Sequence, residues 1–135
     1  GGAAPWRFHA VLLDPPRDAL RAAIGARWNA MLAGGAVEEA RALAALGLDP
    51  ALPAMRAHGV PELLAMLAGR MTMAEASHRA VLNTGQYTKR QATWFRHHAL
   101  APPERTHNIL SRYREDLEYS KTLLDNCVAF LECAR

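Results

Sequence analysis

The sequence has few cysteines and no long apolar run, and both shortages restrict the class of protein. Two cysteines, Cys127 and Cys133, are too few for a disulfide framework, and their spacing would point them to different sides of a helix. We interpret both as packing residues and expect a reducing, cytoplasmic setting. No stretch approaches the ~20 apolar residues of a membrane helix. The N-terminal residues lack the basic start and apolar run of a secretory signal.

What remains is an ordinary globular composition. The 135 residues are 50% apolar, 21% charged and 7% aromatic, which allows one domain of moderate size or part of a larger one. The chain does not begin with Met, which leaves open an excised piece, a processed product or a tagged product.

The motifs of several catalytic sites are also lacking. The sequence contains no Gly-rich phosphate loop, no Cys/His metal spacing and no nucleophile elbow. The carboxylates are scattered without an acid/base pair, and the adjacent His97 and His98 are poor co-ligands for a metal. We therefore assign no catalytic residue and no metal ligand to this chain. We expect His97, His98 and His107 to be neutral surface groups.

Acidic residues are scarce in one window of the sequence. Residues 85–114 contain six basic residues and one acid, a net charge of +5, whereas the rest holds ten basic residues and twelve acids, a net charge of −2. A basic region on a slightly acidic body favours an anionic partner such as a phosphate or a nucleic acid. The alternative is a solvated helix face without a ligand.

Apolar spacing and chain breakers predict a mostly α protein with one or two short strands. The expected elements lie in a single domain over residues 1–135: a short strand in 6–13, a helical region in 14–69, a long basic helix in 72–97, and a strand and helix in 104–135. The long helix is the strongest prediction, because Thr72 and Glu75 have the spacing of a capping box.

The long helix has two different sides when its residues are projected at ~100° each. Gln91 and Trp94 fall on the apolar side, so we expect both to be buried. Lys89 and Arg96 are seven residues apart and nearly superpose on the polar side. Gly85 lies on the same polar edge, and a glycine in a helix costs roughly 1 kcal/mol relative to alanine.

Residues 83–96 read Asn-Thr-Gly-Gln-Tyr-Thr-Lys-Arg-Gln-Ala-Thr-Trp-Phe-Arg. This segment closely resembles the stretch Thr-Arg-Gln-(Tyr/Leu)-Ala-Lys-Arg-Gln-x-Thr-Trp-(Phe/Leu)-Arg of bacterial tRNA dimethylallyltransferases, also called tRNA isopentenyltransferases. Further segments resemble that family in the same order and spacing: residues 27–35, 38–43, 52–62 and 69–76. The resemblance is dense from about Val11 to Arg96 and looser beyond.

The resemblance implies a fold and a chemistry. Full enzymes of the family have an α/β fold like that of P-loop nucleotide kinases, and they transfer a dimethylallyl group from dimethylallyl diphosphate to N6 of the adenine 3′ of the anticodon. A Gly-rich loop and Mg²⁺ hold the diphosphate, an aspartate is the general base, and the adenine is flipped out of the RNA. Because this chain has neither loop nor aspartate motif, it resembles the C-terminal portion, without the P-loop half, and should be inactive alone.

The resemblance also implies which residues bind ligands. The family's long helix contacts the diphosphate and the tRNA anticodon stem-loop through positions that match Gln86, Lys89, Arg90, Thr93 and Arg96. Cations there can neutralise charge on a leaving diphosphate or contact RNA phosphates. Two family cations are replaced: the arginine after Thr84 by Gly85, and the lysine or arginine before Glu62 by Pro61. A diverged, non-functional fragment and a non-enzymatic helical RNA-binding or adaptor module therefore stay open as alternatives.

Overall fold

The computed structural model describes residues 7–112 and 117–133, and the chain folds as two compact units. One unit contains residues 21–90, and the other combines residues 1–20 with residues 91–135. Two long helices, α1 (Arg17–Ala33) and α4 (Met73–His97), contribute to both units. The described chain is mostly helical with two short strands, which confirms the expected fold class. Trp6 of the expected strand and Arg114 of the basic window lie outside the described residues.

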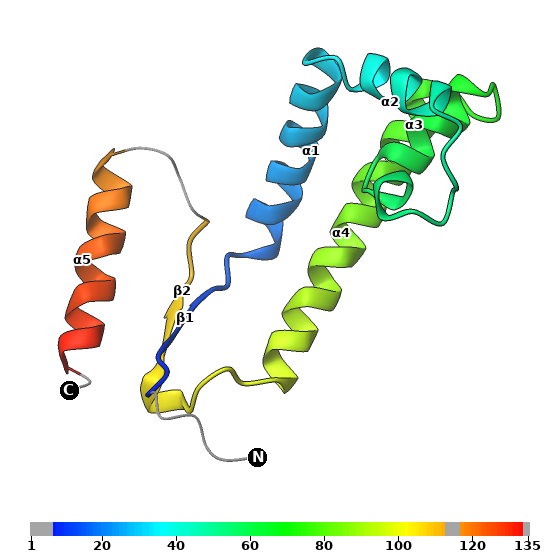
Figure 1. Cartoon of the computed structure of the whole chain (residues 1–135). Helices are drawn as coiled ribbons and strands as arrows, with labels where there is room; N and C mark the ends of the chain where they lie inside the picture. The colour runs from blue at the N-terminus through cyan, green and yellow to red at the C-terminus, as the bar shows by residue number, and fades with distance from the viewer. Residues whose placement is uncertain (1–6, 113–116, 134–135) are drawn as a thin grey trace, which may run out of the picture. The chain divides into compact units, whose positions relative to one another are not determined.

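Three short elements accompany α1 and α4 in the unit of residues 21–90: α2 (Ala36–Ala45), the 3₁₀ turn η1 (Pro53–Arg56) and α3 (Val60–Leu67). Figure 1 shows α2 and α3 beside the N-terminal half of α4. Their shared core combines one large side chain with small ones: Trp28, Ala36, Ala40, Leu63 and Ala80. Alanines at these positions let the helix backbones approach closely around the indole of Trp28.

The turn before α3 depends on Gly59. Its φ of 94° lies in the left-handed region, which a side chain disfavours. A Cβ added there would stand 2.6 Å from Cζ3 of Trp28, so the glycine backbone packs directly on the indole. This contact ties the turn to the core of the unit.

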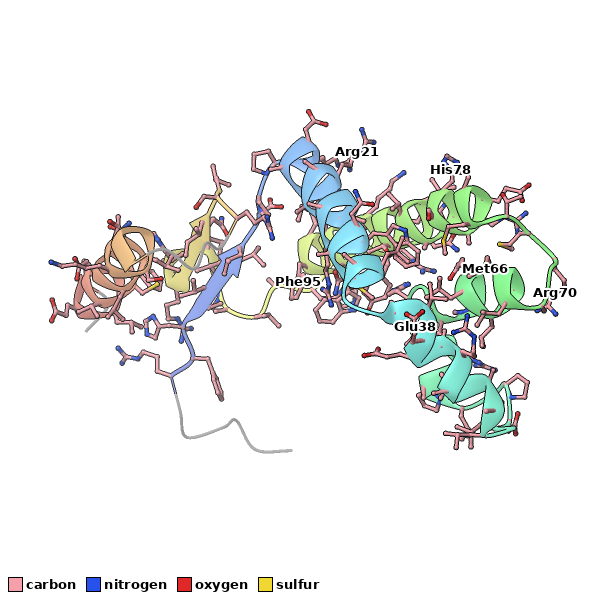
Figure 2. The ribbon with its side chains drawn as sticks, turned by 90° about the horizontal axis from the view of Figure 1, so that it is seen from above. Arg21, Glu38, Met66, Arg70, His78 and Phe95 are labelled. Carbon is pink, nitrogen blue, oxygen red and sulfur yellow. The ribbon has the colours of Figure 1, made fainter. Side chains whose placement is uncertain are left out.

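A buried polar contact connects α3 to α4. The amide Nδ2 of Asn83 donates a hydrogen bond of 2.8 Å to Oε1 of Glu62, whose residue is only 9% exposed. Met66 of α3 also packs on the core, whereas His78 lies on the side of α4 turned away from α3 (Figure 2). The hydrogen bond from the Asn83 amide compensates part of the free-energy cost of burying the Glu62 carboxylate.

The capping box that the sequence predicts at the start of α4 is confirmed. Oε2 of Glu75 accepts bonds from the Thr72 backbone N–H at 2.7 Å and from the Thr72 hydroxyl at 2.9 Å. The Thr72 hydroxyl in turn accepts the Glu75 N–H at 3.2 Å. The bonds from the Thr72 backbone and side chain, with Arg79 nearby, lower the pKa of the Glu75 carboxyl below its ordinary value.

This pKa shift predicts a pH-dependent contribution to stability. A carboxyl with a lowered folded-state pKa stabilises the fold above its unfolded-state pKa, and the contribution disappears as pH falls through the folded-state pKa. We expect Glu75→Gln to melt at a lower temperature than wild type at neutral pH, with the difference vanishing in acid. Melting followed by circular dichroism across pH measures this, with Glu132→Gln on the last helix as control. A melting-temperature difference between wild type and Glu75→Gln that persists unchanged in acid would show that the charge of Glu75 does not stabilise the helix cap.

The other unit contains the two strands. β1 (Ala10–Leu13) pairs in parallel with β2 (Thr106–Ile109), with Val11 opposite His107. The Asp14 N–H continues the pairing to the Ile109 carbonyl at 2.8 Å. Figure 1 shows both strands side by side and the C-terminal helix α5 (Leu117–Cys133).

Phe130 of α5 forms the contact between this helix and the strands. Its ring meets His9 edge-on at 5.8 Å and stacks on His107 at 5.3 Å. His107 is therefore half-buried, so the expectation of a surface group was wrong there, because the residue faces the helix rather than solvent. Cys127 is a half-buried free thiol, and the Cys133 side chain lies outside the described residues.

Apolar surface stays uncovered on both β1 and α5 within the described residues. Val11 and Leu13 are 40% and 44% exposed, although both belong to a strand of four apolar residues. On α5, Leu124, Val128 and Leu131 are also exposed. Parallel sheets are normally covered on both faces, and two strands alone are marginally stable in water.

Candidate functional site

All five residues that the family resemblance assigns to ligand binding lie on α4. Their side chains are exposed: Gln86, Lys89, Arg90, Thr93 and Arg96. The helix geometry alone puts Lys89 and Arg96 about 20° apart around the axis and roughly two turns apart along it. Such a pair can meet two successive anionic groups, for example two phosphates.

The three cationic side chains of this set have no acidic partner among the described side chains. Among the side chains that the structure describes, those of residues 7–112 and 120–132, no carboxylate lies within ion-pairing distance of Lys89, Arg90 or Arg96. Arg41, by contrast, meets Glu38 at 3.8 Å on α2. Exposed cations without a carboxylate partner produce a positive potential over this helix face, which attracts anions.

Tyr87 has two polar neighbours in the unit of residues 21–90. The guanidinium carbon of Arg90 lies over its ring, 5.7 Å from the centroid. The imidazole of His58 meets the same ring edge-on, with centroids 4.9 Å apart and planes at 60°. Tyr87 nevertheless remains 43% exposed. Tyr87 and Arg90 therefore present an exposed aromatic ring next to a cation.

Sequence reasoning missed this role of Tyr87 and His58. The projection puts Tyr87 on the apolar side of the long helix, and the sequence up to His58 indicates no more than one helical turn before Gly59. The Tyr87–Arg90 spacing of three residues could have indicated a cation–π pair, because such residues are neighbours on a helix. No local signal could have found His58, since its contact joins separate parts of the chain.

The expected burial of Gln91 and Trp94 was wrong. Gln91 is exposed and Trp94 is 47% exposed. The Trp94 ring stacks on His98 at 4.6 Å and meets Phe95 edge-on at 5.1 Å, and both partners are near neighbours in the sequence. The buried residues of α4 are Ala76 and Ala80, in its N-terminal half, because that half packs on α3. His97 and His98 are exposed, as expected.

The two positions that depart from the family pattern fit their local structure. Gly85 is half-buried, but a Cβ there would meet nothing within 4 Å, so packing does not require a glycine. Pro61 occupies the first turn of α3, where its missing N–H breaks no helical bond. The departures therefore remove cations without distorting either helix.

Two kinds of feature are absent from the described part of the chain. No group of three or more His, Cys, Asp or Glu side chains in it could hold a metal ion. Among the same residues, no helix combines the length and the apolar character needed to cross a membrane.

Comparison with known proteins defines the family. A family model described as IPP transferase matches residues 2–98. The tRNA dimethylallyltransferase of Acidiphilium cryptum is 53% identical over 130 residues, which are 96% of this chain and 40% of that protein. That of Gluconacetobacter diazotrophicus is 57% identical over 122 residues, 90% of this chain and 37% of that protein.

A solved structure agrees. The full-length tRNA isopentenylpyrophosphate transferase of Bacillus halodurans superposes with a TM-score of 0.74 at 25% identity, covering 96% of this chain and 41% of that one. The fold of this chain is thus shared with part of a tRNA isopentenylpyrophosphate transferase. The chain belongs to the IPP transferase family. It spans about 40% of the length of the curated relatives it matches.

Proposed function

We propose that this chain supplies the tRNA-contacting and diphosphate-contacting helix of a tRNA dimethylallyltransferase. The reaction would move a dimethylallyl group from dimethylallyl diphosphate to N6 of the adenine 3′ of the anticodon, in the cytoplasm. Lys89, Arg90 and Arg96 would hold the anion, with Gln86 and Thr93 as hydrogen-bonding groups. The observation that carries the proposal is the set of exposed α4 cations without a carboxylate partner among the described residues.

The proposed role of these cations is electrostatic. A leaving diphosphate gains negative charge as its bond to the dimethylallyl carbon breaks, and cations held in place stabilise that charge. The same side chains could contact RNA phosphates, which position a nucleic acid without reading its sequence. Gly85 leaves one edge of this surface without the cation that the family resemblance implies.

Mg²⁺ and the general base belong to other parts of the proposed enzyme. The family resemblance implies a Mg²⁺ ion beside a Gly-rich loop, and this sequence has no such loop. The described residues do not fit the ion either, because no three potential ligands come together. We therefore assign no residue of this chain to the ion and expect no prenyl transfer by the chain alone.

Binding of a labelled tRNA anticodon stem-loop at two salt concentrations tests the proposal. Each lost phosphate contact should reduce the slope of log K against log salt by about 0.7–0.9. We expect Lys89→Ala with Arg96→Ala to lower that slope by about 1.5 and to weaken binding at low salt. Lys121→Ala, on exposed α5, is the matched control and should leave the slope unchanged.

Two outcomes would contradict the proposal. The first is stem-loop binding that is absent or insensitive to the paired α4 substitutions. The second is prenyl transfer to tRNA by this chain alone, because that would require donor-binding groups that the sequence lacks. RNA binding without any effect on transfer, when the chain is combined with a P-loop half of a relative, would favour the non-enzymatic binding module.

A further inference from the structure

Gly85 lies at the point of α4 where the packing of the helix changes. Before it, Ala76 and Ala80 are buried, and Asn83 is hydrogen-bonded to α3, so this part of the helix is anchored to its unit. After it, the residues of 86–97 are exposed or half-buried. Gly85 therefore joins an anchored segment of α4 to a largely exposed one.

The packing of the helix gives no reason for a glycine at this position. A Cβ on Gly85 would meet nothing within 4 Å, so a larger residue would fit there. The family resemblance places an arginine at this position, which makes the glycine a property of this chain rather than of the family. Glycine has the greatest backbone freedom to lose in a helix, so it weakens the helix locally.

Two threonines weaken the same part of α4. The Thr84 hydroxyl donates a hydrogen bond of 2.7 Å to the Ala80 carbonyl. The Thr88 hydroxyl donates one of 2.8 Å to the carbonyl of Gly85 itself. Hydroxyls that bond back to carbonyls of the preceding turn compete with backbone N–H donors and often bend helices. The glycine and both of these bonds lie within residues 80–88, so their effects combine in one short stretch.

One side-chain contact connects the two segments of the helix to each other indirectly. Tyr87 follows Gly85, and its ring meets the imidazole of His58 edge-on at 4.9 Å. His58 directly precedes Gly59, whose backbone packs on the buried ring of Trp28. The contact thus ties the exposed segment to the core, but Tyr87 is still 43% exposed and its partner is an exposed residue.

We propose that α4 bends at Gly85, so that residues 86–97 change direction relative to residues 73–84. The contact between His58 and Tyr87 holds one direction of the helix and opens when the helix bends. The bend re-aims Lys89, which follows the glycine. This movement needs no ligand, but its use in aligning a cation with an anion rests on the proposed function. A ligand then selects the direction of the helix that it binds better.

Residual dipolar couplings of the ¹⁵N-labelled full chain measure the bend directly, because they report the direction of each backbone N–H. We expect residues 73–84 and 86–97 of wild type to require two different alignment tensors. Gly85→Ala should bring both segments close to a single tensor, because alanine stiffens the helix without a clash. A single tensor for wild type, or a difference that Gly85→Ala leaves unchanged, would overturn the bend.

Gly25→Ala is the matched control for this experiment. Gly25 also lies inside a long helix, α1, and a Cβ there would meet nothing within 4 Å. It should stiffen α1 by a similar amount and leave the couplings of α4 unchanged. Tyr87→Leu, which removes the ring contact with His58, should increase the difference between the two segments of α4. An unchanged difference in Tyr87→Leu would overturn the role of that contact.

Binding of the labelled anticodon stem-loop tests the use of the bend. Gly85→Ala should raise the Kd about threefold, because the stiffened helix populates less of the direction that the ligand selects. The slope of log K against log salt should not change, since no cation is lost. An unchanged Kd would overturn the re-aiming while leaving the proposed function intact. Loss of the salt-dependent effect of Lys89→Ala with Arg96→Ala would instead refute the proposed function, and the bend measured without RNA would remain.

Discussion

Gly59→Ala should destabilise the unit of residues 21–90 by about 3 kcal/mol, the sum of left-handed backbone strain and a steric clash. The backbone φ of 94° costs a residue with a side chain roughly 1–2 kcal/mol. The new methyl would also stand 2.6 Å from Cζ3 of Trp28, a buried ring atom with little freedom to move. Urea unfolding followed by circular dichroism measures the change in unfolding free energy.

Gly69→Ala provides the matched control for this prediction. Gly69 also has a positive φ, 69°, but a Cβ there would meet nothing within 4 Å. It should therefore cost only the backbone strain, roughly 1–2 kcal/mol. Equal losses for the two substitutions would mean that the Trp28 contact is not a tight one.

Trp28→Ala should cost about 4 kcal/mol, typical of a large aromatic residue removed from a core. Trp28 is the only buried aromatic side chain among the described residues, and it shares its buried cluster with three alanines and Leu63. The alanine side chains are too short to fill the space that an indole leaves, so a cavity would remain. That loss is comparable to the whole stability of a marginal domain, so unfolding at room temperature is the expected result in the urea experiment.

Two further variants show whether burial is the cause. Trp28→Phe should cost only about 1–2 kcal/mol, because phenylalanine keeps a buried ring. The indole N–H that it removes is buried and has no hydrogen-bond partner among the described residues, so no hydrogen bond is lost. Trp94→Ala removes the same side chain from a 47% exposed position and should change stability by about 0.5 kcal/mol. A similarly large loss of unfolding free energy for Trp28→Ala and Trp94→Ala would contradict the assignment of Trp28, and not Trp94, to the core.

A double variant with Gly59→Ala and Trp28→Ala tests whether the two residues are coupled. Once Trp28 is alanine, the methyl of Gly59→Ala meets no indole, so only backbone strain remains. The double variant should therefore lose less unfolding free energy than the sum of the two single losses, as is usual for residues in contact. Because His58 precedes Gly59, the single Gly59→Ala variant should also disturb the contact between His58 and Tyr87.

Local signals in the sequence identified the beginning and length of α4 well. The Thr72–Glu75 capping box acts within a few residues, so its physical effect is readable without tertiary structure. The exposed state of Lys89 and Arg96 also follows from local chemistry, because burying an unpaired cation is costly.

The surroundings of the other side of α4 were harder to infer. The projection puts Tyr87 and Trp94 on the apolar side and predicts burial of Trp94, yet the two residues are 43% and 47% exposed. A helical projection shows which residues share a side but contains no information on whether another segment covers it. Only Ala76 and Ala80 are buried, where α3 packs against the helix.

By itself, the sequence determined the helices, the cap, the cationic side of α4 and, through the motif of residues 83–96, the family. These features depend on neighbouring residues or on spacing along one helix, so short-range chemistry specifies them. Only the tertiary structure decided that Gly59 packs on Trp28 and that His58 meets Tyr87. Those contacts join residues distant in the chain, and they exist only because the folded core brings the segments together.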